Sequence, residues 1–139
     1  MKIEETKHIN SRHYRCVLPF GSFYFFDKFF LSEINEGEHF DWDKIMLLMV
    51  EVYKYYGENF KLAYMSNRVN SYSIEPQSWV KFQKKYNCVL ATAIVAYNNK
   101  GSLSVVLERL FFKEKLQKFS DLDEAISWVQ NLEELKKIY

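Results

Sequence analysis

The spacing of apolar and polar residues divides this 139-residue chain into an antiparallel first part and a longer part of alternating helices and strands. Three short apolar runs come first, at residues 14–18, 23–26 and 29–34. A turn signal containing Pro19 and Gly21 separates the first two runs, and only Asp27 and Lys28 separate the last two. Apolar and aromatic runs joined by so few polar residues are typical of β-hairpins. We therefore predict three antiparallel strands.

From residue 40 onward the apolar period lengthens from two residues to the helical value. Asp41 suits the N-cap of a first helix and Gly57 suits its end. The apolar stripe between them consists of Ile45, Leu48, Met49, Val52 and Tyr56. The remaining pattern predicts strands at 62–65, 89–97 and 117–119, and helices at about 76–86, about 103–112 and after a start signature at 120–123.

This order predicts a single α/β domain over residues 13–139. Its sheet is expected to be mixed, with antiparallel N-terminal strands followed by a βαβαβα part with parallel strands and helices on both faces. Residues 1–12 are polar and show no periodicity, so we predict a flexible N-terminal arm.

Composition and charge exclude several classes of function. Lys plus Arg number 19 and Asp plus Glu number 18, and a net charge of +1 gives no field that attracts nucleic acid or an anionic membrane. Cys16 and Cys88 are far apart, which argues against a disulfide scaffold or a cysteine-rich zinc site. The aliphatic run 45–50 is too short to span a bilayer, and the N-terminus has no signal-peptide core. We expect a cytoplasmic protein that is not transmembrane.

Motifs for catalysis, metals or cofactors are missing from the sequence. It contains no GxSxG, no phosphate-binding GxxxxGK[ST] and no GxGxxG pattern, and His39 has no partner at metal-ligand spacing. We expect no enzyme activity, no cofactor and no metal.

The candidate site is the segment 66–73, between the strand at 62–65 and the helix that begins near Pro76. Loops that leave a sheet strand and enter a helix N-terminus are frequent binding sites in α/β proteins. The candidate binding residues are Ser66, Asn67, Arg68, Asn70, Ser71 and Ser73. Arg68 could hold an anion or carboxylate together with a serine hydroxyl. Alternatively these residues only stabilise the turn, as Ser and Asn often do.

Several stretches resemble one known superfamily. They are Phe23-Tyr24-Phe25, Glu33-Ile34-Asn35-Glu36-Gly37, the segment 66–73 with Pro76 after it, and the ending Phe119-Ser120-Asp121-Leu122-Asp123-Glu124-Ala125-Ile126-Ser127-Trp128. From about residue 22 to residue 132 the chain resembles the STAS and SpoIIAA-like superfamily, and within it a group of small uncharacterised bacterial proteins. The resemblance implies a non-catalytic domain that binds a kinase-like protein and is switched by phosphorylation of a serine. Ser71 and Ser73 are the matching positions, although the Asp-Ser-x-Gly arrangement of that switch is missing.

Two functions follow as hypotheses. The first is a STAS-like binding or regulatory domain that contacts a protein partner through residues 66–73 and the following helix. The alternative is a carrier or sensor of a small apolar or lipid-like molecule, because 29–31 and 110–112 are apolar at consecutive positions. A cavity lined by Phe111, Phe112 and the helix at 45–56 would favour the carrier. An exposed aromatic patch would favour a partner protein or a homodimer.

Overall fold

The computed structural model describes residues 1–97 and 115–136. Six strands form one sheet in the order β1 (Tyr14–Leu18), β2 (Gly21–Phe25), β3 (Phe29–Ile34), β5 (Leu62–Arg68), β7 (Val89–Ala96) and β8 (Lys115–Phe119). A separate parallel pair consists of β4 (His39–Phe40) and β6 (Ser73–Ile74). The helices are α1 (Trp42–Tyr56), α2 (Ser78–Lys85), α4 (Leu122–Gln130) and α5 (Glu133–Lys136), and the 3₁₀ turns are η1 (Ile3–Glu5) and η2 (Lys7–Asn10).

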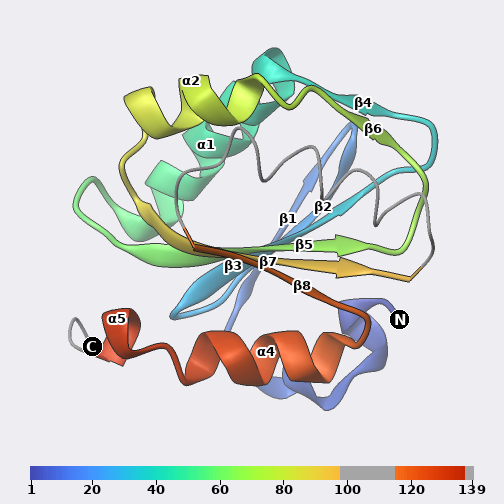
Figure 1. Ribbon diagram of the computed structural model, residues 1–139, viewed down its shortest axis with the longest axis vertical. Coiled ribbons are helices and arrows are strands. Elements are labelled where there is room, and N and C mark those ends of the chain that lie inside the picture. The colour runs from blue at the N-terminus through green and yellow to red at the C-terminus, as the bar shows by residue number, and fades with distance from the viewer. Residues whose placement is uncertain (98–114, 137–139) are drawn as a thin grey trace.

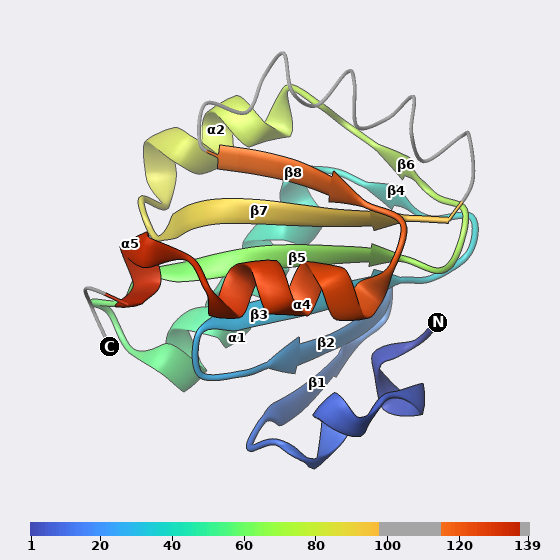
Figure 2. The same cartoon turned by 60° about the horizontal axis from the view of Figure 1, so that its bottom comes forward.

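The sheet is mixed, as the sequence predicted. β1, β2 and β3 pair antiparallel, whereas β3, β5, β7 and β8 are mutually parallel (Figure 2). The hairpin between β2 and β3 closes where Phe26 donates its main-chain N–H to the carbonyl of Phe29 at 2.9 Å. The two polar residues that separate the aromatic runs therefore do form a tight turn.

Helices cover both faces of the sheet (Figure 1), which confirms the predicted layers. On one face α1 and α2 pack over a largely aromatic core that includes Phe23, Phe25, Phe30 and Trp79. On the other face α4 packs over smaller side chains of the central strands, including Ala63, Met65, Ala93 and Val95. Both faces of β3 and β5 are buried, which is why each strand begins with a continuous apolar run, at 29–31 and 62–65.

The predicted helix signals are confirmed for the first helix. Asp41 is the N-cap of α1 and accepts a hydrogen bond from the Lys44 amide at 3.2 Å. Gly57 ends that helix with φ +90°, a conformation that glycine adopts at little cost. The last helix starts one residue later than its signature suggested, because Asp121 and not Ser120 caps α4.

Two sequence predictions differ from the structure in their bounds. β5 continues to Arg68, so the predicted loop at 66–73 is strand over its first three residues. β8 begins at Lys115 and is longer than predicted. The predicted turn at 98–101 and the predicted helix at 103–112, with Phe111 and Phe112, lie outside the described residues.

The first twelve residues lie on the same face of the sheet as α4 (Figures 1 and 2). The predicted flexibility of this arm concerns motion and stays a prediction. In the structure the segment forms η1 and η2, and the Ile3 side chain is completely buried. Ile3 was not recognised as a core residue because it stands alone among polar neighbours.

Candidate functional site

The six predicted site residues lie at and beyond the carboxyl end of β5. Their environments divide them into two groups. Ser66, Asn67 and Arg68 are the last residues of the strand and are 1%, 0% and 7% exposed. Asn70, Ser71 and Ser73 follow the strand, and both serines are exposed. The prediction of one continuous polar loop is therefore wrong for its first half, where the side chains are enclosed between sheet and helices.

On the face of α1 and α2, a chain of hydroxyl contacts holds Arg68 inside the domain. The Ser66 Oγ lies 3.0 Å from the Tyr72 hydroxyl and accepts a hydrogen bond from the Arg68 Nε at 3.1 Å. The guanidinium carbon is 6.0 Å from the centre of the Tyr72 ring, within the range of a cation–π contact. The Arg68 side chain thus stabilises the end of β5 and does not project into solvent.

On the opposite face, a buried polar cluster joins the strand ends to the N-terminus. The Glu33 Oε2 accepts hydrogen bonds from the Ile3 amide at 2.7 Å and from the Asn67 Nδ2 at 2.8 Å. The same Nδ2 donates to the carbonyl of Met1 at 2.9 Å, and the Tyr97 hydroxyl donates to the Asn67 Oδ1 at 2.8 Å. Asn67 therefore has a structural role, which is to connect β5 to β3 and to the first three residues.

Burial raises the pKa of Glu33 above its ordinary value, and the hydrogen bonds from Ile3 and Asn67 only partly oppose this effect. The folded protein consequently holds the Glu33 proton more tightly than the unfolded chain does. This carboxyl group makes the protein less stable as the pH rises from the ordinary pKa through the raised one.

We expect Glu33→Gln to gain stability relative to the wild type as the pH increases. The glutamine does not titrate, and its Oε1 can still accept from Ile3 and Asn67. Urea unfolding of both proteins from about pH 4 to about pH 8 measures the difference, which should grow with pH. A difference that stays constant over this range would contradict the prediction, and Glu124→Gln, at an exposed position of α4, is the control.

The exposed half of the predicted site is fixed by main-chain hydrogen bonds to the segment before α1. The Gly37 amide donates to the Ser71 carbonyl at 2.8 Å, and the Ser73 amide donates to the Glu38 carbonyl at 2.9 Å. The Ser71 amide donates to the Glu36 Oε2 at 2.6 Å. The Ser71 amide is therefore already bonded to a carboxylate of the protein itself.

Acidic side chains dominate this edge of the molecule. We call residues 35–41 and 71–75, which include β4 and β6, the acidic ribbon. Its carboxylates are those of Glu36, Glu38, Asp41 and Glu75, and its imidazole, His39, shares a hydrogen bond with the Ser73 Oγ at 2.7 Å. Lys44 is 3.5 Å from Glu38 and neutralises part of this charge. A depression of about 220 Å³ beside the ribbon is lined by Asp41, Trp42, Asp43, Glu75 and Lys81.

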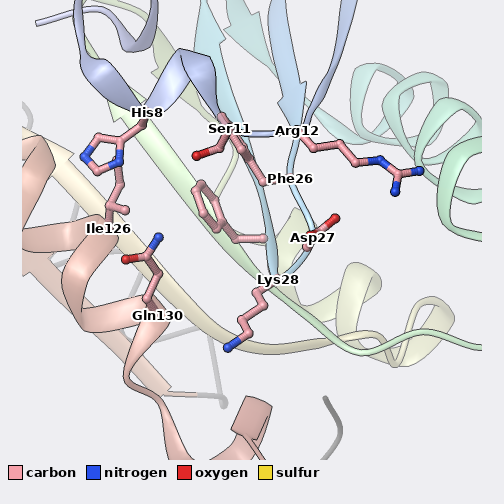
Figure 3. Close-up of a pocket in the computed structure, with 9 residues that line it drawn as sticks. His8, Ser11, Arg12, Phe26, Asp27, Lys28, Ile126 and Gln130 are labelled. Atoms are coloured by element: carbon pink, nitrogen blue, oxygen red, sulfur yellow. The ribbon is translucent and has the colours of Figure 1, made fainter.

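Two cavities bear on ligand binding. The apolar space lined by described residues of α1, α2 and the sheet measures about 10 Å³, roughly the size of one water molecule and too small for a lipid-like molecule. The predicted cavity with Phe111 and Phe112 lies outside the described residues. A larger pocket of about 300 Å³ lies on the α4 face (Figure 3). Its lining includes His8, Ser11, Arg12, Phe26, Lys28 and Gln130. Sequence reasoning missed this pocket because its residues come from three segments that are far apart in the chain.

Burial makes both cysteine thiols and the Tyr64 hydroxyl harder to deprotonate than usual. Cys16 and Cys88 are buried free thiols, and burial raises the pKa of both, that of Cys88 to about 11. Burial also raises the pKa of Tyr64 well above its ordinary value. Within residues 1–97 and 115–136, no three His, Cys, Asp or Glu side chains gather as metal ligands, and no helix is long and apolar enough to cross a membrane.

No protein-family profile and no curated protein sequence matches the chain. Among solved structures, it is similar to an uncharacterised protein from the DUF3478 family with a SpoIIAA-like fold, from Shewanella loihica PV-4. The TM-score is 0.50 at 9% identity, and the match covers 85% of this chain and 92% of that chain. This likeness concerns the fold alone. It confirms the predicted fold class and the resemblance to SpoIIAA-like proteins: the chain is a mixed α/β domain with a SpoIIAA-like fold.

Proposed function

We propose that this chain is a non-catalytic, STAS-like binding domain that contacts a protein partner through the acidic ribbon. The observation that carries the proposal is the combination of a fixed main chain and exposed side chains at Ser71 and Ser73. A surface that is already ordered loses little conformational entropy when a partner binds. The buried residues Ser66, Asn67 and Arg68 end the strand that precedes the second segment of the ribbon.

The charge of the ribbon suggests a basic partner segment. Glu36, Glu38 and Glu75 carry negative charge close to both serines. The neighbouring depression adds Asp43, which Lys81 in its lining partly offsets. A lysine or arginine of the partner would be attracted to such a group of carboxylates. Affinity should therefore fall as the salt concentration rises.

Phosphorylation of Ser71 would act on the same surface. Its amide is bonded to the Glu36 carboxylate, so a phosphate on the neighbouring hydroxyl would bring two like charges together. Repulsion between them would loosen the ribbon. Under this proposal, phosphorylation reduces the order on which binding depends.

Site-specific photo-crosslinking tests the proposed surface. We expect a benzophenone amino acid at position 71 to capture a protein that the same group at position 127 does not capture. Ser127 is a matched control, because it is an exposed serine on α4, on the opposite face of the sheet. The same products from both positions, or none from position 71, would overturn the proposal.

The captured partner, once purified, gives a second measurement. Glu36→Gln combined with Glu38→Gln should weaken binding about tenfold, since removing charge pairs costs on the order of 1.4 kcal/mol or more. Glu124→Gln should leave the affinity unchanged. Equal affinities for all three proteins, measured by titration calorimetry at low salt, would contradict the role of the ribbon charges.

A further inference from the structure

β1 forms one edge of the six-stranded sheet, as Figure 2 shows. It pairs with β2, and outside that pairing no main-chain to main-chain hydrogen bond within residues 1–97 and 115–136 involves Tyr14–Leu18. An edge strand presents a row of N–H and C=O groups that can pair with a strand of another molecule. Charged side chains often prevent such pairing, and β1 carries a single one, Arg15.

The hydrogen bonds of the neighbouring hairpin show which main-chain groups of β1 point outward. The Phe26 amide donates to the Phe29 carbonyl, and bonded and non-bonded pairs alternate along an antiparallel ladder. Counting back from this pair, the even-numbered residues of β2 bond to β3 and the odd-numbered ones bond to β1. The even-numbered residues of β1 lie opposite those odd-numbered ones. The main-chain groups of Arg15 and Val17 therefore point away from the sheet.

Apolar side chains flank this open edge. Of the seven large apolar side chains that the described residues expose, five belong to β1 or α1, namely Tyr14, Val17, Leu47, Val50 and Tyr55. Val17 is 63% exposed, and on the other face of the sheet Tyr14 is 48% exposed and stacks on the Tyr55 ring at 5.5 Å. Leu47 lies on the same side of α1 as Tyr55, since eight residues are close to two helical turns. Exposed apolar groups that adjoin one another in this way mark interaction surfaces.

Charge and Pro19 select one antiparallel register between this edge and the same edge of a second copy. If Arg15 faced Arg15 of the second copy, like charges would lie directly opposite each other, which is destabilising. If Val17 faced Val17, Arg15 would lie opposite Pro19, which has no N–H to donate. With Arg15 opposite Val17 of the second copy, both symmetric pairs can form their main-chain hydrogen bonds, and the arginine stem can cover the valine.

We infer that β1 pairs antiparallel with β1 of a second copy of this chain in this register, so that two sheets continue into each other across a two-fold axis at Cys16. Burial raises the pKa of Cys16 most, and the charges of Glu51 and Lys54 also act on it, so these side chains of α1 lie near the axis. They form an ion pair at 3.4 Å within each copy and add no net charge there. This inference does not involve the acidic ribbon, so either proposal can fail without the other.

Sedimentation velocity of the wild-type protein tests whether it associates. We expect a monomer–dimer equilibrium with a Kd on the order of 10 µM, because pairing through one five-residue strand and its flanking side chains makes a small interface. A protein that stays monomeric up to about 200 µM would overturn the inference, since that concentration is about twentyfold above the expected Kd.

Two substitutions of one residue test the register. Val17→Lys and Val17→Glu both remove the exposed apolar side chain, but the ammonium would face Arg15 of the second copy with like charge and the carboxylate with opposite charge. We expect the lysine variant to dimerise about tenfold more weakly than the glutamate variant, a difference of about 1.4 kcal/mol. Gln117→Lys, at an exposed position of β8 on the opposite edge of the sheet, is the control and should dimerise like the wild type. Equal dissociation constants for the two Val17 variants would overturn the inference.

The native cysteines give an independent test of the axis. The two Cys16 residues would form a non-hydrogen-bonded pair with Cα atoms about 4.5 Å apart, a separation that a disulfide can bridge. Oxidation with diamide should link two copies of Cys88→Ser through Cys16 and should not link copies of Cys16→Ser. Copies of Cys88→Ser that stay unlinked at a concentration at which they sediment as dimers would overturn the inference, as would linked copies of Cys16→Ser.

Discussion

Asn67→Ala is expected to lower the free energy of unfolding by about 3 kcal/mol, because it removes hydrogen bonds from a buried charged group. The Asn67 amide is completely buried and bonds to Glu33, Met1 and Tyr97. Without it, the Ile3 amide is the one donor left to the Glu33 carboxylate within residues 1–97 and 115–136. The first ten residues should lose protection at the same time, since Met1 loses its bond to β5.

Urea denaturation measures the stability of this variant, and hydrogen exchange measures the protection of the N-terminal amides. Asn35→Ala is the control, because Asn35 is exposed and its side chain makes a long hydrogen bond of 3.3 Å to the Pro19 carbonyl. It should change stability by less than about 0.5 kcal/mol. If Asn67→Ala were no less stable than this control, the buried cluster would not have the structural role assigned to it.

Gly21→Val is expected to destabilise the protein by about 3 kcal/mol through overpacking. Gly21 is the first residue of β2 and pairs with Ile34 of β3. A Cβ at this position would lie 2.8 Å from the Glu33 carbonyl oxygen and 3.1 Å from the Ile34 Cα. Both are main-chain atoms, so β2 and β3 would have to separate at this pair.

Ser22→Val, at the next position of the same strand, is the matched control for β propensity. Its site is partly exposed, and valine is favourable in strands, so stability should change by less than about 0.5 kcal/mol. Thermal unfolding followed by circular dichroism compares the two variants. Similar melting temperatures for both would show that the close approach at Gly21 is easily relieved.

The features that sequence predicted well depend on local signals. The hairpin turn at Asp27 and Lys28, the cap at Asp41 and the helix end at Gly57 each involve neighbouring residues only. The end of β5 was misjudged because Ser66, Asn67 and Arg68 are polar, and polar residues usually leave the sheet. Their partners, Glu33 and Tyr72 among them, become neighbours only in the folded state.

In the candidate sites, too, contacts between residues far apart in the chain could not be predicted from the sequence. The sequence predicted Ser71 and Ser73 in a segment that follows a strand. It could not show that the Glu36 carboxylate would accept a hydrogen bond from the Ser71 amide. The pocket on the α4 face was not predicted, since no spacing motif joins His8, Lys28 and Gln130. These residues meet because the N-terminal segment and α4 cover the same face of the sheet.

The antiparallel meander of β1, β2 and β3 affects the order in which the chain assembles during synthesis. Its strands are consecutive, so the pairings of β1 with β2 and of β2 with β3 are local and can form as soon as Ile34 has left the ribosome. β3 is buried on both faces in the folded protein, and its second neighbour, β5, is completed only at Arg68. Until β5 has formed, the edge of β3 in the nascent chain is unpaired and can pair with strands of other chains. The nascent chain therefore most needs protection from aggregation after Ile34 has been synthesised and before Arg68 has emerged.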